Sequence, residues 1–188
     1  TVGLVSRTFI VPISHSQDTA GPMTDTVRDA AELLTVIAGS DPADPATREA
    51  DRHRTNYAAH LDAGALHGKR IGVLRFASSP TLDPAFDTAL AVLRAQGAIL
   101  VDIKTFDQRG LGENENLVLN TELKADMAKY LKSSPAPIAS RTLADLIAFN
   151  KDHAQQEMTL FGQEQFEAAE KTKGLADPAY KNARQTSF

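Results

Sequence analysis

The sequence has 188 residues, of which 42% are apolar and 23% charged, with a net charge of −4. That length and balance are typical of a globular chain with a substantial core. The basic residues are scattered, so the chain lacks the basic stripe with which nucleic-acid-binding proteins neutralise phosphates. No apolar run approaches the roughly 18 residues that cross a bilayer. Neither a nucleic acid nor a membrane is therefore expected as a partner. The absence of cysteine excludes disulfides, thiol nucleophiles and thiolate metal sites.

The first predicted element is a helix over residues 25–38, preceded by the strand-like residues 1–6. Thr24 is the expected cap, because its hydroxyl can accept a hydrogen bond from a free N–H of the first turn. Apolar residues recur at helical spacing, which predicts one buried face, and Gly39 ends the helix. The apolar positions are Val27, Ala30, Ala31, Leu34, Ile37 and Ala38.

A strand–helix–strand unit follows after a polar crossing segment that contains a short helix near Tyr57. Residues 70–76 are predicted to form a buried strand. A helix capped by Asp83 is predicted to begin at Pro84 and to stop at Gly97. Its expected inward residues are Phe86, Leu90 and Leu93. Residues 98–103, "AILVDI", are an almost continuous apolar run, as expected for a parallel strand covered on both faces. Together these segments predict a βαβ unit.

Beyond residue 106 the pattern is helical. Residues 109–116, "RGLGENEN", are predicted as a loop, residues 117–131 as a helix, and residues 142–172 as helical with a break at Gly162. The expected core positions of the last stretch are Leu143, Leu146, Ile147, Met158, Phe161 and Phe166. The fold class is therefore α/β with a helix-rich C-terminal part.

Two isolated patterns suggest chemistry without completing a site. Thr1 has the hydroxyl and amine of an N-terminal nucleophile, but such a site needs a cation to tune the amine, and the first lysine is Lys69. His153 and Glu157 lie four residues apart on a predicted helix, a spacing at which both can bind one metal. Two ligands are too few for a stable site, and a solvated helical face is the alternative.

A third pattern brings together the residue types of a serine triad. His15 stands beside Ser14 and Ser16, and Asp18 follows. Neighbours in an extended segment point to opposite faces, and a triad is a spatial arrangement rather than a sequential one. A structural or exposed His15 is the alternative. The residues alone thus identify no active site.

The N-terminal stretch carries a longer and more specific pattern. Residues 1–47, "TVGLVSRTFIVPISHSQDTAGPMTDTVRDAAELLTVIAGSDPADPAT", contain S-x-D-x-x-G-P-M, then V-x-D-A-A-x-L-L-x-x-I-A-G, then D-x-x-D. In this pattern the chain strongly resembles the amidase signature family. Residues 140–164, "SRTLADLIAFNKDHAQQEMTLFGQE", and residues 174–180, "GLADPAY", resemble the branch that contains bacterial peptide amidases.

The resemblance implies a mixed-sheet amidase signature domain with covering helices, of which residues 1–188 would form an internal portion. The family hydrolyses carboxamides with a Ser–cis-Ser–Lys triad, and the resemblance implies neither a cofactor nor a metal. The chain contains no "G-G-S-x-G-G-S" stretch, and Lys69 follows the helix predicted over residues 25–38 instead of preceding a serine segment. No catalytic residue is therefore matched here. The triad is expected upstream of Thr1, and this chain alone is expected to be inactive.

The resemblance also suggests a role for residues 12–24 as a support for the catalytic loop. The candidate supporting residues are Ser16, Gln17, Asp18 and Gly21. Asp18 is expected to accept hydrogen bonds from backbone N–H groups of that loop. Gly21 would set the entry of the chain into the helix predicted over residues 25–38. The alternative is that Asp18 caps a local turn.

The implied function is an amide hydrolase that releases ammonia from carboxamides such as C-terminal peptide amides through a serine acyl-enzyme. Its partners would be the amide substrate and the remainder of the amidase chain. Two alternatives are the amidase subunit of a tRNA-dependent amidotransferase, which shares the signature, and a non-catalytic α/β interaction module.

Overall fold

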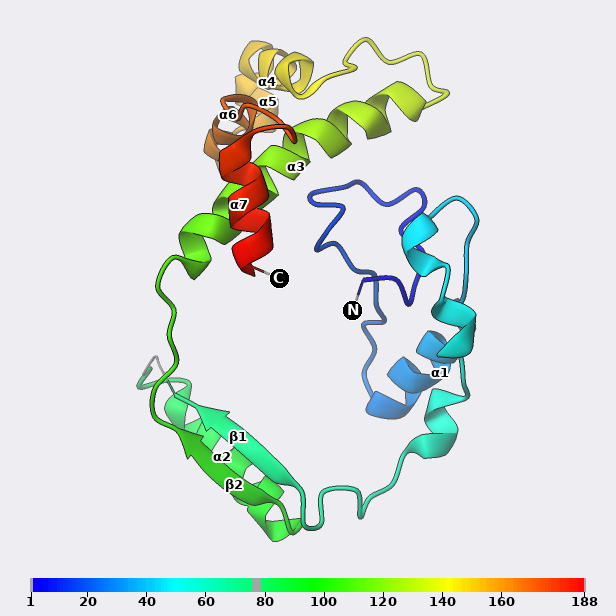
Figure 1. The fold of residues 1–188 in the computed structure, drawn as a ribbon, viewed down its shortest axis with the longest axis vertical. Coiled ribbons are helices and arrows are strands. Elements are labelled where there is room, and N and C mark those ends of the chain that lie inside the picture. The colour runs from blue at the N-terminus through cyan, green and yellow to red at the C-terminus, as the bar shows by residue number, and fades with distance from the viewer. Residues whose placement is uncertain (1, 76–78, 188) are drawn as a thin grey trace. The chain divides into compact units, whose positions relative to one another are not determined.

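The computed structural model describes residues 2–75 and 79–187, and Figure 1 shows its helices and strands. In chain order these are α1 (Val27–Ile37), β1 (Arg70–Leu74), α2 (Asp83–Ala95), β2 (Ile99–Ile103), α3 (Leu111–Ser133), α4 (Leu143–Asp152), α5 (Ala154–Glu157), α6 (Glu164–Glu170) and α7 (Pro178–Ser187). Three short 3₁₀ turns lie between α1 and β1, at Pro45–Thr47, Ala50–Arg52 and Tyr57–His60. The α/β class and the helix-rich C-terminal part are confirmed.

The chain divides into two compact units. One unit comprises Thr1–Pro22, Ile37–Arg54 and Gln108–Phe188, and the other comprises Met23–Val36 and Thr55–Asp107. We refer to them as the helical unit and the βαβ unit. Among the described residues, no helix is both long and apolar enough to cross a bilayer.

The βαβ unit contains the predicted strand–helix–strand. Strands β1 and β2 pair in parallel, with Arg70 opposite Ile99 and Leu74 opposite Ile103, and α2 lies on one face of the pair (Figure 1). Residue 76, the predicted end of the first strand, lies outside the described residues. The prediction that β2 is covered on both faces is wrong for the described residues, because this sheet has two strands and one packed helix. Ile99 accordingly remains 53% exposed.

Helix α2 differs from its prediction at one end. Asp83 is its first residue rather than its cap, and Leu82 holds the capping position without a side-chain hydrogen bond. The predicted inward residue Leu90 is buried, whereas Phe86 is 40% exposed and stacks under the guanidinium of Arg75. Gly97, with a φ of +85°, follows the end of the helix as predicted.

Helix α1 begins later than predicted because another threonine caps it. The Thr26 hydroxyl accepts a hydrogen bond of 3.1 Å from the N–H of Asp29, while the Thr24 hydroxyl donates to the carbonyl of Thr26. The predicted capping role of Thr24 is therefore wrong. The expected buried face is only half-buried, and Val27 is 74% exposed.

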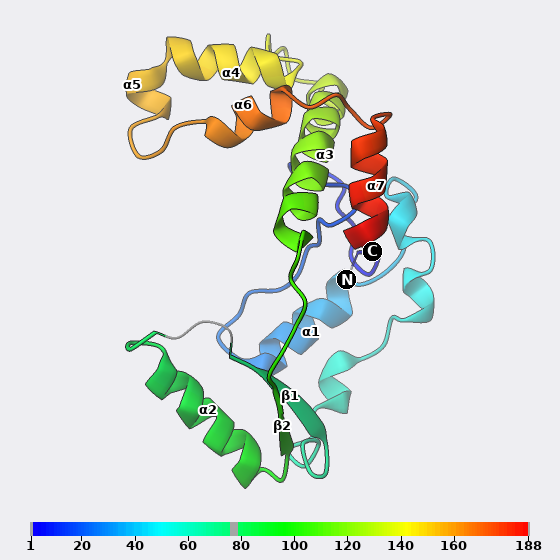
Figure 2. The ribbon, with the colours of Figure 1, turned by 60° about the vertical axis from the view of Figure 1, so that its left-hand side comes forward.

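Helix α3 organises the helical unit. Helix α7 lies along it, and α4 and α6 pack near its C-terminal end (Figures 1 and 2). Two groups of buried residues form the core. The larger contains Leu123, Met127, Leu131, Leu143, Ile147 and Ala169, and the smaller contains Val118, Tyr180 and Ala183.

The loop predicted for residues 109–116 is wrong, because α3 already begins at Leu111. Gly110, with a φ of +72°, turns the chain just before the helix. The sequence pattern does not predict α7 at all, since this helix has few apolar residues. The predicted break at Gly162 is confirmed, because α5 ends at Glu157 and α6 begins at Glu164.

Most of the predicted core positions between residues 143 and 166 are confirmed. Leu143 and Ile147 are buried, and Leu146 and Phe166 pack against them. Phe161 is an exception, with 79% of its surface exposed. It lies in the turn between α5 and α6 rather than on a helical face, so helical spacing does not apply to it.

The N-terminal residues form no strand among the residues described. Val5 makes a single antiparallel bridge with Ala38, and the N–H of Gly39 donates to the carbonyl of Leu4 at 3.1 Å. Beyond this bridge, side-chain hydrogen bonds hold the segment in place.

Candidate functional site

The segment from Ile13 to Asp18 is a hydrogen-bonded turn in the helical unit. The N–H groups of Gln17 and Asp18 donate to the carbonyl of Ser14 at 3.0 and 2.8 Å. The Asp18 carboxylate accepts, at 2.9 Å each, from the N–H groups of Ile13 and Ser14. In these contacts Asp18 closes its own turn, as the local-turn alternative describes. Its support of a catalytic loop stays a prediction.

A buried carboxylate on α3 anchors this turn. Glu122 has no exposed surface, and its Oε2 atom accepts from the Ser14 hydroxyl at 2.6 Å and from the Ser16 N–H at 3.1 Å. Its Oε1 atom accepts from the Tyr180 hydroxyl on α7 at 2.6 Å. One carboxylate thus joins the turn and two helices.

The surroundings of Glu122 favour its ionised form. Burial acts to raise the pKa of Glu122, but hydrogen bonds from Ser14, Tyr180 and Ser16 outweigh it and leave the pKa below its usual value. Arg184 Nε also lies 3.6 Å from Oε1. Burial, together with the hydrogen bond to this carboxylate, raises the pKa of Tyr180 to about 12, so the phenol stays a donor.

His15 extends the hydrogen-bonded cluster around Glu122 toward the surface. Its N–H donates to Asp126 Oδ2 at 2.7 Å, and its ring Nδ1 lies 2.8 Å from the same oxygen. Its Nε2 lies 3.6 Å from Glu122 Oε1. Arg7 donates to the carbonyl oxygen of His15 at 2.6 Å. Asp126 follows Glu122 by four residues on α3, so both carboxylates face the Ile13–Asp18 turn.

A second pair of carboxylates holds the preceding residues. Arg7 binds Asp44 in a two-pronged ion pair, with Nη2 2.9 Å from Oδ1 and Nε 2.9 Å from Oδ2. The hydrogen bond from Arg7 lowers the pKa of Asp44 to about 2. Asp41 accepts from the hydroxyls of Ser6 and Thr8, which lower its pKa as well.

The residue types of a serine triad near His15 do not form a triad. The ring of His15 faces Asp126, while Asp18 binds backbone N–H groups. Ser14 is fully buried and its hydroxyl donates to a carboxylate. The structural role of His15 that the sequence left open is therefore the one observed.

Of the two other isolated patterns, the one at Thr1 lies outside the described residues. The other, His153 with Glu157, has no third metal ligand nearby among the described residues. The ring Nδ1 of His153 lies 2.9 Å from the carbonyl oxygen of Phe149, and the two rings stack. Glu157 donates its N–H to the carbonyl of His153, which places the pair in ordinary helix geometry.

Among the described residues, one group has at least three side chains placed closely enough to hold a metal. It comprises His15, Glu122 and Asp126, whose ligand atoms lie within 4.8 Å of one another. Hydrogen-bond donors already occupy both oxygens of Glu122. The geometry is therefore that of a hydrogen-bonded cluster around a carboxylate.

Two of the remaining predicted supporting residues, Ser16 and Gln17, contribute through the backbone. Ser16 binds Glu122 through its N–H, and its hydroxyl lies 3.4 Å from that of Ser14. Gln17 closes the turn through its own N–H. A side chain at Gly21 would meet no atom within 4 Å, so the space around Gly21 does not require a glycine.

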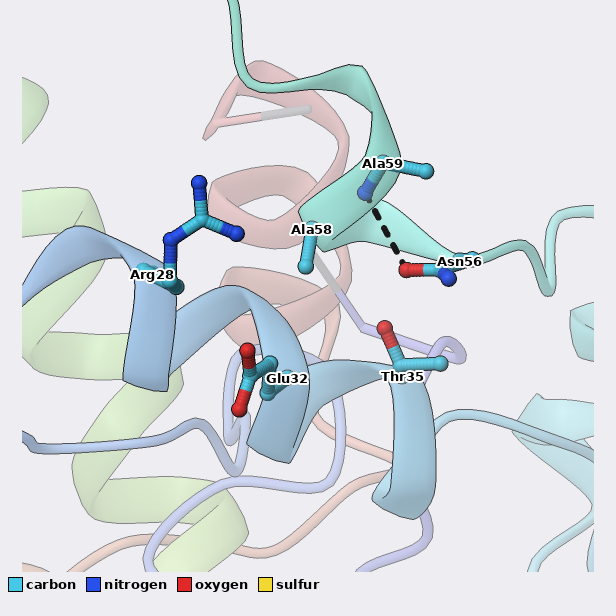
Figure 3. A pocket seen from close by; sticks show the side chains of 6 residues that line it. All are labelled: Arg28, Glu32, Thr35, Asn56, Ala58 and Ala59. Carbon is cyan, nitrogen blue, oxygen red and sulfur yellow. Dashed lines mark hydrogen bonds between the residues drawn. The ribbon is translucent and has the colours of Figure 1, made fainter.

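The βαβ unit contains an open pocket of about 440 Å³ (Figure 3). It is lined by Arg28, Glu32, Thr35, Asn56, Ala58 and Ala59. The Thr35 hydroxyl donates to the carbonyl of Ala31 and accepts from the N–H of Tyr57 at 3.0 Å. Since these bonds use its hydrogen and a lone pair, Thr35 ties α1 to the 3₁₀ turn rather than acting as a nucleophile.

Sequence reasoning missed the centre of the cluster. Glu122 and Asp126 lie in a polar stretch of α3, and Tyr180 lies on a helix that the sequence pattern does not predict. The available signal was weak: a glutamate and an aspartate spaced by one helical turn face the same side.

Comparisons with known proteins agree on one family. The family model described as Amidase matches residues 1–187. A probable amidase of Arabidopsis thaliana is 38% identical over 186 residues, which cover 94% of this chain and 35% of that protein. A glutamyl-tRNA(Gln) amidotransferase subunit of Chloroflexus aurantiacus is 37% identical over 134 residues, covering 69% of this chain and 27% of that protein.

Solved structures agree as well. The native peptide amidase of Stenotrophomonas maltophilia is 48% identical, with a TM-score of 0.86 over 99% of this chain and 38% of that chain. An amidase family protein of Bacillus anthracis is 31% identical, with a TM-score of 0.85 over 99% of this chain and 36% of that chain. The chain spans 27% to 38% of the length of these four proteins. The resemblance found in the sequence is confirmed, and the chain belongs to the amidase family.

Proposed function

We propose that residues 1–188 form an internal portion of a single amidase signature domain and that the protein hydrolyses carboxamides. The observation that carries this proposal is the likeness to peptide amidase, at 48% identity over 99% of the chain. C-terminal peptide amides are accordingly the proposed substrates, and ammonia and a free carboxylate the products.

The proposed reaction passes through an acyl-enzyme. A serine hydroxyl attacks the amide carbon, its proton passes through the cis-Ser to a neutral lysine, and backbone N–H groups hold the oxyanion. The proton then moves to the departing nitrogen, ammonia leaves, and water cleaves the ester. We place the two serines and the lysine outside residues 1–188, since no "G-G-S-x-G-G-S" stretch occurs in them.

Residues 16–21 contribute to this reaction by position. We propose that Ser16, Gln17, Asp18 and Gly21 support the loop that carries the nucleophile. The tight closure of the turn by Asp18 supports this role, because a support must hold one shape.

The test compares this chain with a longer amidase chain that contains it and the serine segment. Ammonia release from a C-terminal peptide amide is measured, with the corresponding free-acid peptide as control. The longer chain is expected to be active and the 188-residue chain inactive. Turnover by the 188-residue chain of verified mass, or a folded but inert longer chain, would contradict the proposal.

A second candidate is the amidase subunit of a tRNA-dependent amidotransferase. The 37% identity to the Chloroflexus protein favours it, but that match covers 69% of the chain. Copurification of a partner protein, with amide transfer to charged tRNA, would support this candidate. A non-catalytic interaction module predicts no labelling of the longer chain by a serine-directed phosphonate.

A further inference from the structure

We infer that Glu122 is a positioning residue for amide hydrolysis, and that it sets the location of the Ile13–Asp18 turn on α3. The inference rests on the proposed function, because it assigns the turn a part in catalysis. The structural half of the inference, that Glu122 fixes the turn, is testable without any activity.

The carboxylate of Glu122 is a buried charge. Glu122 has no exposed surface, although glutamate is almost never fully buried unless it is paired. A buried carboxylate is tolerated only where donors replace the lost water. Ser14, Ser16 and Tyr180 supply three such donors at 2.6 to 3.1 Å. A turn displaced from this position would leave the carboxylate without two of them.

The two carboxylate oxygens of Glu122 bind different parts of the helical unit. Among the hydrogen bonds of the described residues, Oε2 accepts only from the turn, through Ser14 and Ser16. Oε1 accepts from Tyr180 on α7, and Arg184 Nε lies 3.6 Å away. Since α7 packs along α3, one oxygen is tied to the helix pair and the other to the turn.

Asp18 and Glu122 act on the turn in different ways. Asp18 binds N–H groups within its own turn, so it determines the shape of the turn. Glu122 comes from a different part of the chain and, together with Asp126, which binds His15, holds the turn on α3. The titratable or charged groups that face Glu122 are His15 on the turn, Asp126 on α3 and Arg184 on α7.

The link to chemistry is geometric. Displacement of a reacting group by about 1 Å, caused by a change far from the chemistry, can lower the rate about a hundredfold. If the turn supports the catalytic loop, a loosened turn slows the chemical step while substrate binding elsewhere is unchanged. The expected signature is a loss of kcat without a rise in KM.

The experiment uses the longer amidase chain with Glu122→Gln, which keeps the shape of the side chain but puts an NH₂ group against donors. The control is Thr121→Val, which removes a buried hydroxyl from the same helix. Thr121 donates to the carbonyl of Leu117 and not to the turn. Rates on a peptide amide and hydrogen exchange of the amides of residues 13–18 are measured for both.

Glu122→Gln is expected to lower kcat by about 10- to 100-fold with KM changed less than about twofold, and to speed exchange at the Ser16 amide. Thr121→Val is expected to leave both readouts unchanged. Equal kcat values for the two variants, or unaltered exchange in residues 13–18, would overturn the inference. If Glu122→Gln does not fold, Ser14→Ala replaces it, because it removes a donor from the same contact. If the unaltered longer chain is inert, the proposed function fails, while the exchange measurement still decides whether Glu122 fixes the turn.

Discussion

Ser14 donates a 2.6 Å hydrogen bond to Glu122, although the two residues lie 108 positions apart in the sequence. Neither side chain has exposed surface. Water therefore cannot replace the bond when it is lost, and this makes the pair sensitive to small changes.

The first prediction concerns the donor. Ser14→Ala is expected to lower the free energy of unfolding by about 1–3 kcal/mol, because it removes a donor from a buried carboxylate. Urea denaturation measures the effect. The control is Thr186→Ala, which removes an exposed hydroxyl on α7 and is expected to change stability by less than about 0.5 kcal/mol. Equal effects would show that the contact with Glu122 contributes nothing.

The second prediction concerns the fork of Arg7. Lysine keeps the charge, but its single ammonium group cannot bind both oxygens of Asp44 and the carbonyl of His15 at the same time. Arg7→Lys is expected to cost about 1–3 kcal/mol of unfolding free energy. The matched change Arg52→Lys affects an exposed pair with Glu49 and is expected to cost less than about 1 kcal/mol. A harmless Arg7→Lys would contradict the importance of the two-pronged geometry.

The third prediction concerns the stability of the fold at low pH, where Asp44 becomes protonated. The pKa of Asp44 is lowered from 3.8 to about 2 by Arg7, so its contribution is complete above the unfolded value and is lost as the pH falls toward 2. Stability should fall by on the order of 2 kcal/mol from this group over that range. Asp44→Asn should flatten the pH dependence there. Urea denaturation at a series of pH values tests this, and an unchanged slope in the variant would refute it.

The fourth prediction concerns Gly97, whose φ is +85° and whose position would place a Cβ 2.9 Å from the ring of His67. Gly97→Ala is expected to destabilise the βαβ unit by more than about 1 kcal/mol, from backbone strain and crowding together. Gly112→Ala is the control, because it adds a methyl group to α3 in open space and should be neutral or slightly stabilising. Circular dichroism during thermal unfolding compares the two, and equal melting temperatures would count against the strain at Gly97.

These contacts also show what could be read from the sequence. The strand–helix–strand of residues 70–103 is predictable because strand and helix patterns, and a stop at Gly97, are local signals. The break at Gly162 is predictable for the same reason. By contrast, the start of α3 escapes prediction because "GENEN" is polar, and α7 because "AYKNARQ" has little apolar content.

The candidate site was only partly predictable. The amidase pattern points to Ser16 and Asp18, and the structure places both in one turn. It could not indicate Glu122, because a buried glutamate is set by tertiary contacts and leaves no periodic trace. Nor could it pair His15 with Asp126, 111 positions away.

The way the N-terminal residues are held has a consequence for the order of folding. Arg7 can form its ion pair only after Asp44 has been synthesised, and Ser14 can form its hydrogen bond only after Glu122 has been synthesised. During synthesis residues 7–18 therefore emerge long before α3, and contacts between distant residues form slowly. We expect residues 13–18 to acquire protection last in pulse-labelled refolding, after α3 and α7 have paired.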